Sequence, residues 1–229
     1  MMKIKIFHNP KKEWAEKAAR EVEAYLAKRG HAACKKGAGA TIIIGGDGTV
    51  IHHKNDIEGI LIGIGSKRSG ICQLGRDGWK GRIERMLHAK PEELFMLEAE
   101  ISGRRYSVMN DISVRSPDFR AVHTRVSCPH VDQGFFGDGI NICGRLGSTG
   151  YNRSLFGPLV LKNDVVVIAP IAPILQQPNA IVMPFCSIKV SCLERACCVI
   201  DGQHTVKMGK SIEVRKGKRI LYGKDGIVI

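Results

Sequence analysis

A glycine-rich loop with one carboxylate follows a short run of β-branched residues. Thr41-Ile42-Ile43-Ile44 leads directly into Gly45-Gly46-Asp47-Gly48-Thr49. Glycine leaves the backbone amides bare, so such a loop can approach a phosphate closely. A carboxylate there would repel the phosphate unless Mg²⁺ or a substrate hydroxyl lies between them. The loop therefore indicates phosphoryl chemistry in which Asp47 accepts a hydroxyl proton or steers Mg²⁺, and the alternative is an ordinary turn.

The glycine spacing separates this loop from two other phosphate loops. It is G-G-x-G and not the G-x-G-x-x-G of a dehydrogenase, and no Gly-Lys-Ser/Thr of a Walker loop follows. The residues expected to hold phosphate oxygens are Gly45, Gly46, Gly48 and Thr49. Lys67 and Arg68 in the next glycine-rich stretch are candidate donors to a triphosphate, and solvated loop charge explains them equally well.

Two later groups offer polar atoms to a nucleotide. Asn110 has both a donor and an acceptor for an adenine edge or a ribose, whereas ionised Asp111 only accepts and suits hydroxyls. Gly147-Ser148-Thr149 would present hydroxyls and amides at a helix start, and Tyr151 adds an aromatic face. The structural alternatives are a turn between strands for the first group and a helix cap for the second.

Residues 1–98 have the pattern of an open parallel α/β sheet, Rossmann-like in character. The expected strands are 3–7, 41–44 and 59–64, and the expected helices are 11–29, 79–88 and a short one begun by Pro91. The strand at 41–44 is apolar throughout, as in a strand buried on both faces. This sheet would place the first glycine loop at the end of a central strand.

Residues 99–229 change to short strand-like runs broken by Gly, Asn, Asp and Pro, which indicates an antiparallel sandwich or barrel, and an all-β sandwich is the fold we expect. One helix is expected, from Thr149 to about Leu155. The last strands, from about 211 to 229, stay in this domain or return to the first. The sequence thus predicts two domains, with a phosphate loop in the first and the candidate nucleotide groups in the second.

The composition narrows the class of protein. The 44% hydrophobic content is that of a globular protein with a sizeable core. The net charge of +13, from 35 Lys and Arg against 22 Asp and Glu, favours polyanionic partners, or is a generally basic surface. The apolar stretches are shorter than a membrane span, and lysines interrupt the apolar residues at the N-terminus, so we expect a cytoplasmic protein without a signal peptide.

The cysteines and histidines lack the spacing of a metal site. The eight cysteines form no C-x-x-C pair and are expected to be reduced thiols packed as small hydrophobic groups. His123, His130 and His204 show no ligand spacing, so no protein-held metal is assigned. His52 and His53 follow the phosphate loop, where a surface or packing role is expected.

Four motifs, in order along nearly the whole chain, resemble the NAD kinase family. They are Gly45 to Thr49, Ser69-Gly70-Ile71-Cys72, Asn110-Asp111, and Gly137-Asp138-Gly139-Ile140 with Gly147-Ser148-Thr149-Gly150-Tyr151-Asn152-Arg153-Ser154. The resemblance, to the small prokaryotic type, implies phosphorylation of the adenosine-ribose 2′-hydroxyl of NAD to give NADP. ATP or polyphosphate would be the donor, with substrate-bound Mg²⁺. It also implies a homo-oligomer, a dimer or tetramer. From the residues themselves we expect no nucleic-acid partner, because aromatic residues make up 6% of the chain and no aromatic-basic RNA-binding motif is present. We expect no membrane partner, because no exposed amphipathic helix is obvious.

The resemblance implies a role for each matching residue. Asp47 would be catalytic, and the glycine loop with Lys67 and Arg68 would hold the phosphoryl donor. The residues implied for NAD binding are Gly70, Ile71, Asn110, Asp111, Asp138, Ser148, Thr149, Gly150, Tyr151 and Ser154.

Several positions depart from the family pattern. Asp111 replaces the usual Glu, Ile71 replaces an aromatic residue, and Gly144-Arg145-Leu146 replaces a segment that commonly contains Thr-Pro. These changes suit a divergent active enzyme, a shifted substrate or a member that binds nucleotide without turnover. A lipid kinase of the diacylglycerol or sphingosine type is the other alternative, because such kinases share the Gly-Gly-Asp-Gly loop. The intact loop around Asp47 favours NAD kinase activity.

Overall fold

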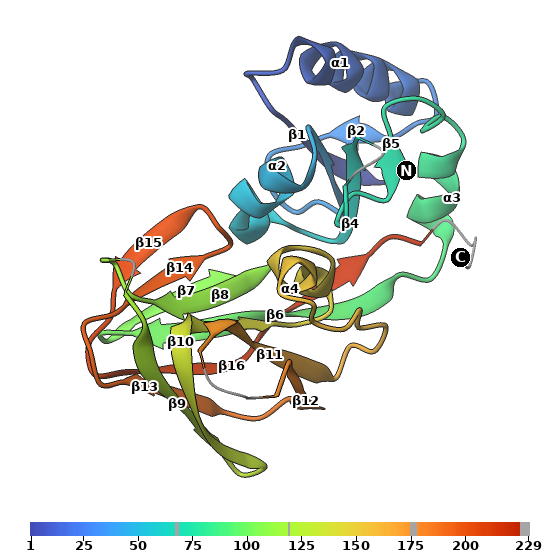
Figure 1. The fold of residues 1–229 in the computed structure, drawn as a ribbon. Helices are drawn as coiled ribbons and strands as arrows, with labels where there is room; N and C mark the ends of the chain where they lie inside the picture. Colours follow the sequence, from blue (N-terminus) through green and yellow to red (C-terminus); the bar gives the residue numbers. More distant parts are fainter. Residues whose placement is uncertain (67–68, 119, 175–177, 225–229) are drawn as a thin grey trace. The chain divides into compact units, whose positions relative to one another are not determined.

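The fold is that of a computed structural model, which describes residues 1–66, 69–118, 120–174 and 178–224. The chain forms two compact units (Figure 1). The first comprises Met1–Leu94 and the segment that starts at Ile220, and the second comprises Phe95–Arg219. The first unit is α/β and the second is mostly β, which is the fold class expected from the sequence.

The first unit is built on a parallel sheet. Its strands are β1 (Lys3–His8), β2 (Ala32–Ala33), β3 (Ala40–Ile44), β4 (Ile60–Gly65), β5 (Leu74–Gly75) and the end of β16 (Ser211–Tyr222). They are ordered β2-β1-β3-β4, and both β5 and β16 pair with β4. Every one of these pairings is parallel. The carboxyl ends of β1, β3 and β4 therefore meet at one edge of the sheet.

Helices pack on this sheet. They are α1 (Glu13–Ala27), α2 (Asp47–His52) and α3 (Arg82–His88), and the 3₁₀ turn η1 (Lys54–Asp56) follows α2. Helix α1 buries Ala15, Ala19, Val22 and Leu26. These positions are three and four residues apart, so they form one apolar face, which packs on β1 and β3.

The prediction that a short helix begins at Pro91 is wrong. Strand β6 (Glu92–Ile101) occupies this segment, and Leu97 to Ile101 pair antiparallel with β7 (Arg104–Val108). Proline permits a helix start but does not require one. Buried and less buried residues alternate from Leu97 to Ile101, the period of a strand with one face on a core.

Antiparallel strands of the second unit surround a large apolar core. Besides β6, β7 and most of β16, they are β8 (Asp111–Arg115), β9 (Val122–Cys128), β10 (Val131–Cys143), β11 (Val165–Pro173), β12 (Ile181–Pro184), β13 (Ile188–Cys192), β14 (Cys197–Ile200) and β15 (His204–Lys207). The expected helix at 149–155 is instead two short pieces, the 3₁₀ turn η2 (Leu146–Thr149) and α4 (Tyr151–Ser154).

The helices of the described part of the chain are short. The longest, α1, has 15 residues, so none has the length and apolar character needed to cross a membrane.

Candidate functional site

A cleft of about 320 Å³ lies in the first unit, where the ends of β1, β3 and β4 meet. In parallel α/β sheets, ligands bind outside the carboxyl ends of the strands. The residues that line the cleft are Asn9, Lys12, Trp14, Gly45, Gly46, Asp47, Gly48, Thr49, Ser66, Ser69 and Arg76. The five residues of the predicted phosphate loop are all among them.

Gly45 has a conformation and a packing that other residues do not tolerate. Its φ is +148°, and an added Cβ would lie 2.5 Å from Thr49 Oγ1. Its backbone N–H donates to the carbonyl of Ile64 at 2.9 Å, which attaches the loop to β4. A Cβ added to the next residue, Gly46, would meet nothing closer than 3.8 Å, so the Cα of Gly46 borders open space in the cleft.

The backbone of Ser69–Cys72, which we call the second glycine loop, holds the Asp47 carboxylate. Its Oδ2 accepts a hydrogen bond from the N–H of Gly70 at 2.6 Å, and its Oδ1 accepts from those of Ile71 at 3.0 Å and Cys72 at 3.1 Å. Three predicted site residues, Asp47, Gly70 and Ile71, are thus brought together. The contact uses the main chain of Ile71, whose side chain is buried.

Two cations missed by the sequence analysis line the same cleft. Lys12 Nζ donates to the carbonyl of Gly45 at 2.5 Å, and the Arg76 guanidinium lies over the Trp14 ring, 4.3 Å from its centre. Neither belongs to a motif, because the fold alone brings them to the loop. Among the described lining residues they face a single carboxylate, that of Asp47. The predicted Lys67 and Arg68 lie outside the described residues.

Cys72, whose amide donates to Asp47, is not a nucleophile. Burial raises the pKa of its thiol to about 12, and the Asp47 charge acts in the same direction. The thiol therefore stays protonated at neutral pH.

In the second unit, Asn110 and Asp111 form a turn fixed by Asp201. The Asp201 carboxylate accepts hydrogen bonds from the backbone N–H groups of Asn110 at 2.6 Å, Met109 at 3.2 Å and Asp111 at 3.3 Å. The Asn110 side chain donates to Asp111 Oδ2 at 2.8 Å. The predicted Asn-Asp pair is therefore one rigid turn, and Asp201 was not predicted as part of it.

Asp111 is a carboxyl group in an unusual state. Burial, and then the nearby Asp201 charge, raise the pKa of Asp111 to about 7, although the hydrogen bond from Asn110 acts in the opposite direction. Its side chain can therefore donate as well as accept near neutral pH.

The predicted serine-threonine segment packs against this turn. A Cβ added to Gly147 would lie 1.7 Å from the Asn110 carbonyl oxygen, and one added to Gly150 would lie 2.7 Å from Asn110 Nδ2. Both positions are glycine because Asn110 approaches so closely. The structure thus brings together two predicted motifs that are 37 residues apart in the chain, from Asn110 to Gly147.

The hydroxyls of this segment are used internally to different degrees. Ser148 is buried; its Oγ donates to the Arg145 carbonyl at 2.7 Å and accepts the Val160 N–H at 3.1 Å. Thr149 is exposed and donates to the Leu146 carbonyl at 3.1 Å. Three other predicted residues are placed at the surface to different extents. Tyr151 is half-buried in α4, and Ser154 and Asp138 are exposed.

Sequence comparisons give relatives named NAD kinase. The chain is 28% identical over 191 residues to the NAD kinase of Fusobacterium nucleatum, an alignment that covers 76% of this chain and 70% of that protein. It is 27% identical over 237 residues to the NAD kinase of Thermotoga sp. strain RQ2, an alignment that covers 96% of this chain and 90% of that protein. No family model matches the chain.

Solved structures share the fold. An NAD kinase from Archaeoglobus fulgidus in complex with ATP superposes with a TM-score of 0.84 at 18% identity, over 98% of this chain and 94% of that one. A yeast NADH kinase complexed with NADH superposes with a TM-score of 0.82 at 15% identity, over 99% of this chain and 84% of that one. These likenesses confirm the predicted fold class. The relatives, at 27–28% identity, support the NAD kinase family and indicate a kinase.

Proposed function

We propose that this chain phosphorylates the adenosine-ribose 2′-hydroxyl of NAD to give NADP, with ATP or polyphosphate as the donor. One observation carries the proposal. The loop around Asp47 lines a cleft together with Lys12 and Arg76, in a chain about 27% identical to NAD kinases over most of its length. The comparisons do not favour a lipid kinase or a non-catalytic nucleotide-binding protein.

Asp47 Oδ2 is the atom that we assign to the acceptor hydroxyl. A carboxylate has about four acceptor positions, two on each oxygen. Oδ1 already accepts two N–H groups and Oδ2 accepts one. The remaining position on Oδ2 can take the proton of the 2′-hydroxyl as that oxygen attacks the γ-phosphorus, while the amides of Gly70 to Cys72 hold the carboxylate in place.

The phosphoryl donor would occupy the cleft. Negative charge develops on the transferred phosphoryl group and on the leaving phosphate, and Lys12 and Arg76 are placed to offset it. The cleft offers one carboxylate among its described lining residues. Mg²⁺ is usually held by one or two carboxylates together with phosphates and waters, so these residues fit an ion that arrives on the triphosphate.

The second-unit turn would bind the nucleoside part of NAD. Asn110 has a donor and an acceptor in its side chain, and Asp111 with a pKa of about 7 offers either to a ribose or an adenine edge. The exposed Thr149 and the half-buried Tyr151 are the accessible members of the adjacent segment. Buried Ser148 would support that segment through its internal hydrogen bonds.

The test is NADP formation from NAD with Mg²⁺, measured separately with ATP and with polyphosphate. We expect product with at least one donor, and a loss of about a hundredfold or more in Asp47→Asn, the scale for removing an acid-base group. Asp77→Asn, an exposed carboxylate of the same unit that does not line the cleft, is the matched control and should keep its activity. Absence of product with either donor, from folded protein that binds NAD, would leave a nucleotide-binding protein instead of a kinase.

A further inference from the structure

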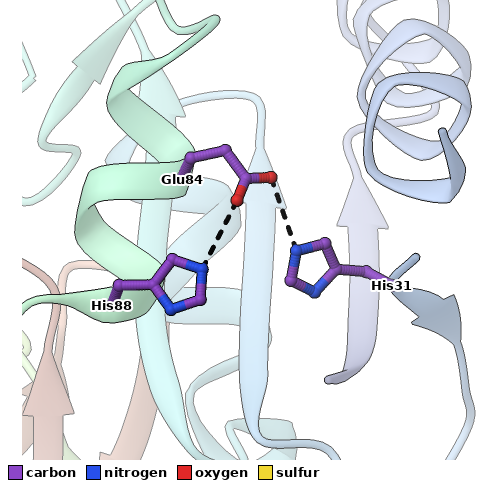
Figure 2. A group of neighbouring side chains, drawn as sticks. All are labelled: His31, Glu84 and His88. Carbon is purple, nitrogen blue, oxygen red and sulfur yellow. Dashed lines mark ion pairs between the residues drawn. The ribbon is translucent and has the colours of Figure 1, made fainter. Parts of the chain in front are cut away.

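Three metal-ligating side chains converge in the first unit, away from the cleft. Figure 2 shows the rings of His31 and His88 pointing one nitrogen each toward different oxygens of Glu84. Glu84 and His88 are one turn apart on α3, and His31 precedes β2. Ala32, which follows His31, donates its backbone N–H to the carbonyl of Met2, just before the start of β1. The cleft lies beyond the other end of that strand. The cluster is therefore at the opposite end of the sheet.

The distances are those of a ligand shell. His31 Nε2 lies 3.4 Å from Glu84 Oε1, and His88 Nε2 lies 3.6 Å from Glu84 Oε2. Bonds of about 2.0–2.2 Å from Zn²⁺ to nitrogen and oxygen place neighbouring ligand atoms of a tetrahedron about 3.3–3.6 Å apart. One ligand atom from each residue lies within 4.8 Å of the other two. A small rotation of exposed His88 would complete the shell.

Buried polar atoms in the cluster lack hydrogen bonds. Glu84 Oε1 and His31 Nδ1 are both buried without a hydrogen-bond partner, and the His31 side chain is only 6% exposed. Arg29 Nε is 3.8 Å from the same Glu84 oxygen, beyond hydrogen-bond distance, and its guanidinium lies over the Tyr25 ring. A buried carboxylate oxygen without a hydrogen bond costs free energy, and a cation bound between Glu84 and His31 would remove that cost.

We propose that His31, Glu84 and His88 bind a divalent transition-metal ion, with Zn²⁺ as the best match. Two imidazole nitrogens and one carboxylate form a ligand set that Zn²⁺ and its neighbours prefer, whereas Mg²⁺ and Ca²⁺ prefer oxygen. A water takes the fourth position, reached from the exposed side of His88. Among the described residues, this is the one group of three His, Cys, Asp or Glu side chains close enough to share an ion.

The bound ion joins two segments that are distant in the chain. His31 follows α1, and α3 lies more than 50 residues later, so the metal links the connection between α1 and β2 to both turns of α3. An ion that binds the folded unit and not the unfolded chain stabilises it by mass action. The role is structural, and it does not depend on the kinase activity proposed above.

The experiment measures binding of Zn²⁺ alone by equilibrium dialysis, and thermal unfolding with and without it. We expect one more Zn²⁺ bound per chain in the parent than in His88→Ala or Glu84→Gln. The parent should show a Tm rise of about 5 °C or more when free Zn²⁺ exceeds its Kd a hundredfold. His88 is 68% exposed, so replacing it leaves the fold intact. His130→Ala, an exposed histidine outside the cluster, is the control and should behave like the parent.

The variants also separate this site from the thiols. All of these proteins carry the same eight free cysteines, so a difference between the parent and His88→Ala belongs to the cluster. Co²⁺ should give a tetrahedral absorption spectrum in the parent that is lost in both cluster variants. Equal Zn²⁺ stoichiometry and equal Tm shifts in all four proteins would overturn the site, whatever the result of the kinase assay.

Discussion

The backbone N–H of Gly70 donates a hydrogen bond to the Asp47 carboxylate at 2.6 Å, across 23 residues of chain. Together with the amides of Ile71 and Cys72, it makes the second glycine loop a support for the carboxylate of the first. A side chain that accepts three amides is fixed in direction. Asp47 therefore combines two roles, since the same carboxylate that would act on a hydroxyl also orders the loop beneath it.

Replacing Asp47 should loosen that loop even without substrate. In Asp47→Asn, an NH₂ group replaces one oxygen and cannot accept a hydrogen bond, so at least one amide loses its partner. Hydrogen bonds to charged groups contribute about 1.5–3 kcal/mol, so amide exchange at Gly70, Ile71 and Cys72 should speed up roughly tenfold or more. Hydrogen exchange read by NMR measures this. Unchanged exchange at all three amides would mean that the loop is ordered by other contacts, such as that between Tyr222 Oη and the Ile71 carbonyl.

Gly45 should be the least replaceable glycine of the first loop. Gly45→Ala places a Cβ 2.5 Å from Thr49 Oγ1 and 2.7 Å from Asn9 Cβ, at a φ of +148°. We expect a loss of at least about 2 kcal/mol in stability. Gly78→Ala is the matched control, because its φ of +76° is also positive but nothing lies within 4 Å of the added Cβ. That variant should lose only about 1 kcal/mol. Urea unfolding of the two proteins compares them, and equal losses would contradict the steric argument.

Asp111 should make the stability of the second unit depend on pH. Its folded pKa of about 7 lies above the ordinary value of 3.8, so the folded state binds more protons between these values. Its contribution to stability is complete below pH 3.8 and is lost as the pH rises to about 7. The Asn side chain of Asp111→Asn does not ionise, so the free energy of unfolding of this variant should match that of the parent near pH 3.8. Above pH 7 it should be more stable by at least about 1 kcal/mol.

Urea midpoints across this pH range measure the effect. Asp164→Asn, an exposed carboxylate of the same unit, is the control and should follow the parent at every pH. A constant offset between Asp111→Asn and the parent would show that Asp111 does not titrate in this window.

Ser148 and Thr149 should respond differently to loss of their hydroxyls. Ser148→Ala leaves the buried Val160 N–H without its acceptor, so we expect a loss of about 1–3 kcal/mol. Thr149→Ala removes an exposed hydroxyl, so its stability should change by less than about 0.5 kcal/mol while its KM for NAD rises. Thermal unfolding and NADP formation separate the two effects. A destabilised Thr149→Ala with unchanged KM would reverse these roles.

The sequence predicted the elements whose signals are local. The β-branched run of β3 and the three- and four-residue apolar steps of α1 each indicate one structure, and both are confirmed. Pro91 failed as a signal because a residue that is merely allowed at a helix start cannot outweigh the pairing of β6 with its neighbour β7 and with the distant β16. The two-residue strands β2 and β5 are too short to have a pattern of their own.

The residues of the candidate site also differ in whether the local sequence predicts them. Asp47 and the Asn110-Asp111 pair have recognisable neighbours in the chain and were predicted as site residues. Lys12 and Arg76 were missed because only the parallel sheet brings them to the loop. The hydroxyl of Ser148 was predicted for a ligand, yet it is bonded within the protein, a distinction that depends on burial and has no sequence signal.

The end of strand β16 belongs to the first unit but is synthesised after the whole of the second unit. Leu221 and Tyr222 pair with β4, Tyr222 Oη donates to the Ile71 carbonyl, and the Gln73 side chain donates to the Gly223 carbonyl. During translation these residues leave the ribosome after the whole of Phe95–Arg219. The contiguous second unit can therefore fold first. The loop that supports Asp47 acquires its contacts with Tyr222 and Gly223 only when those residues emerge, so a ribosome stalled before Ile220 would carry the glycine loop without these contacts.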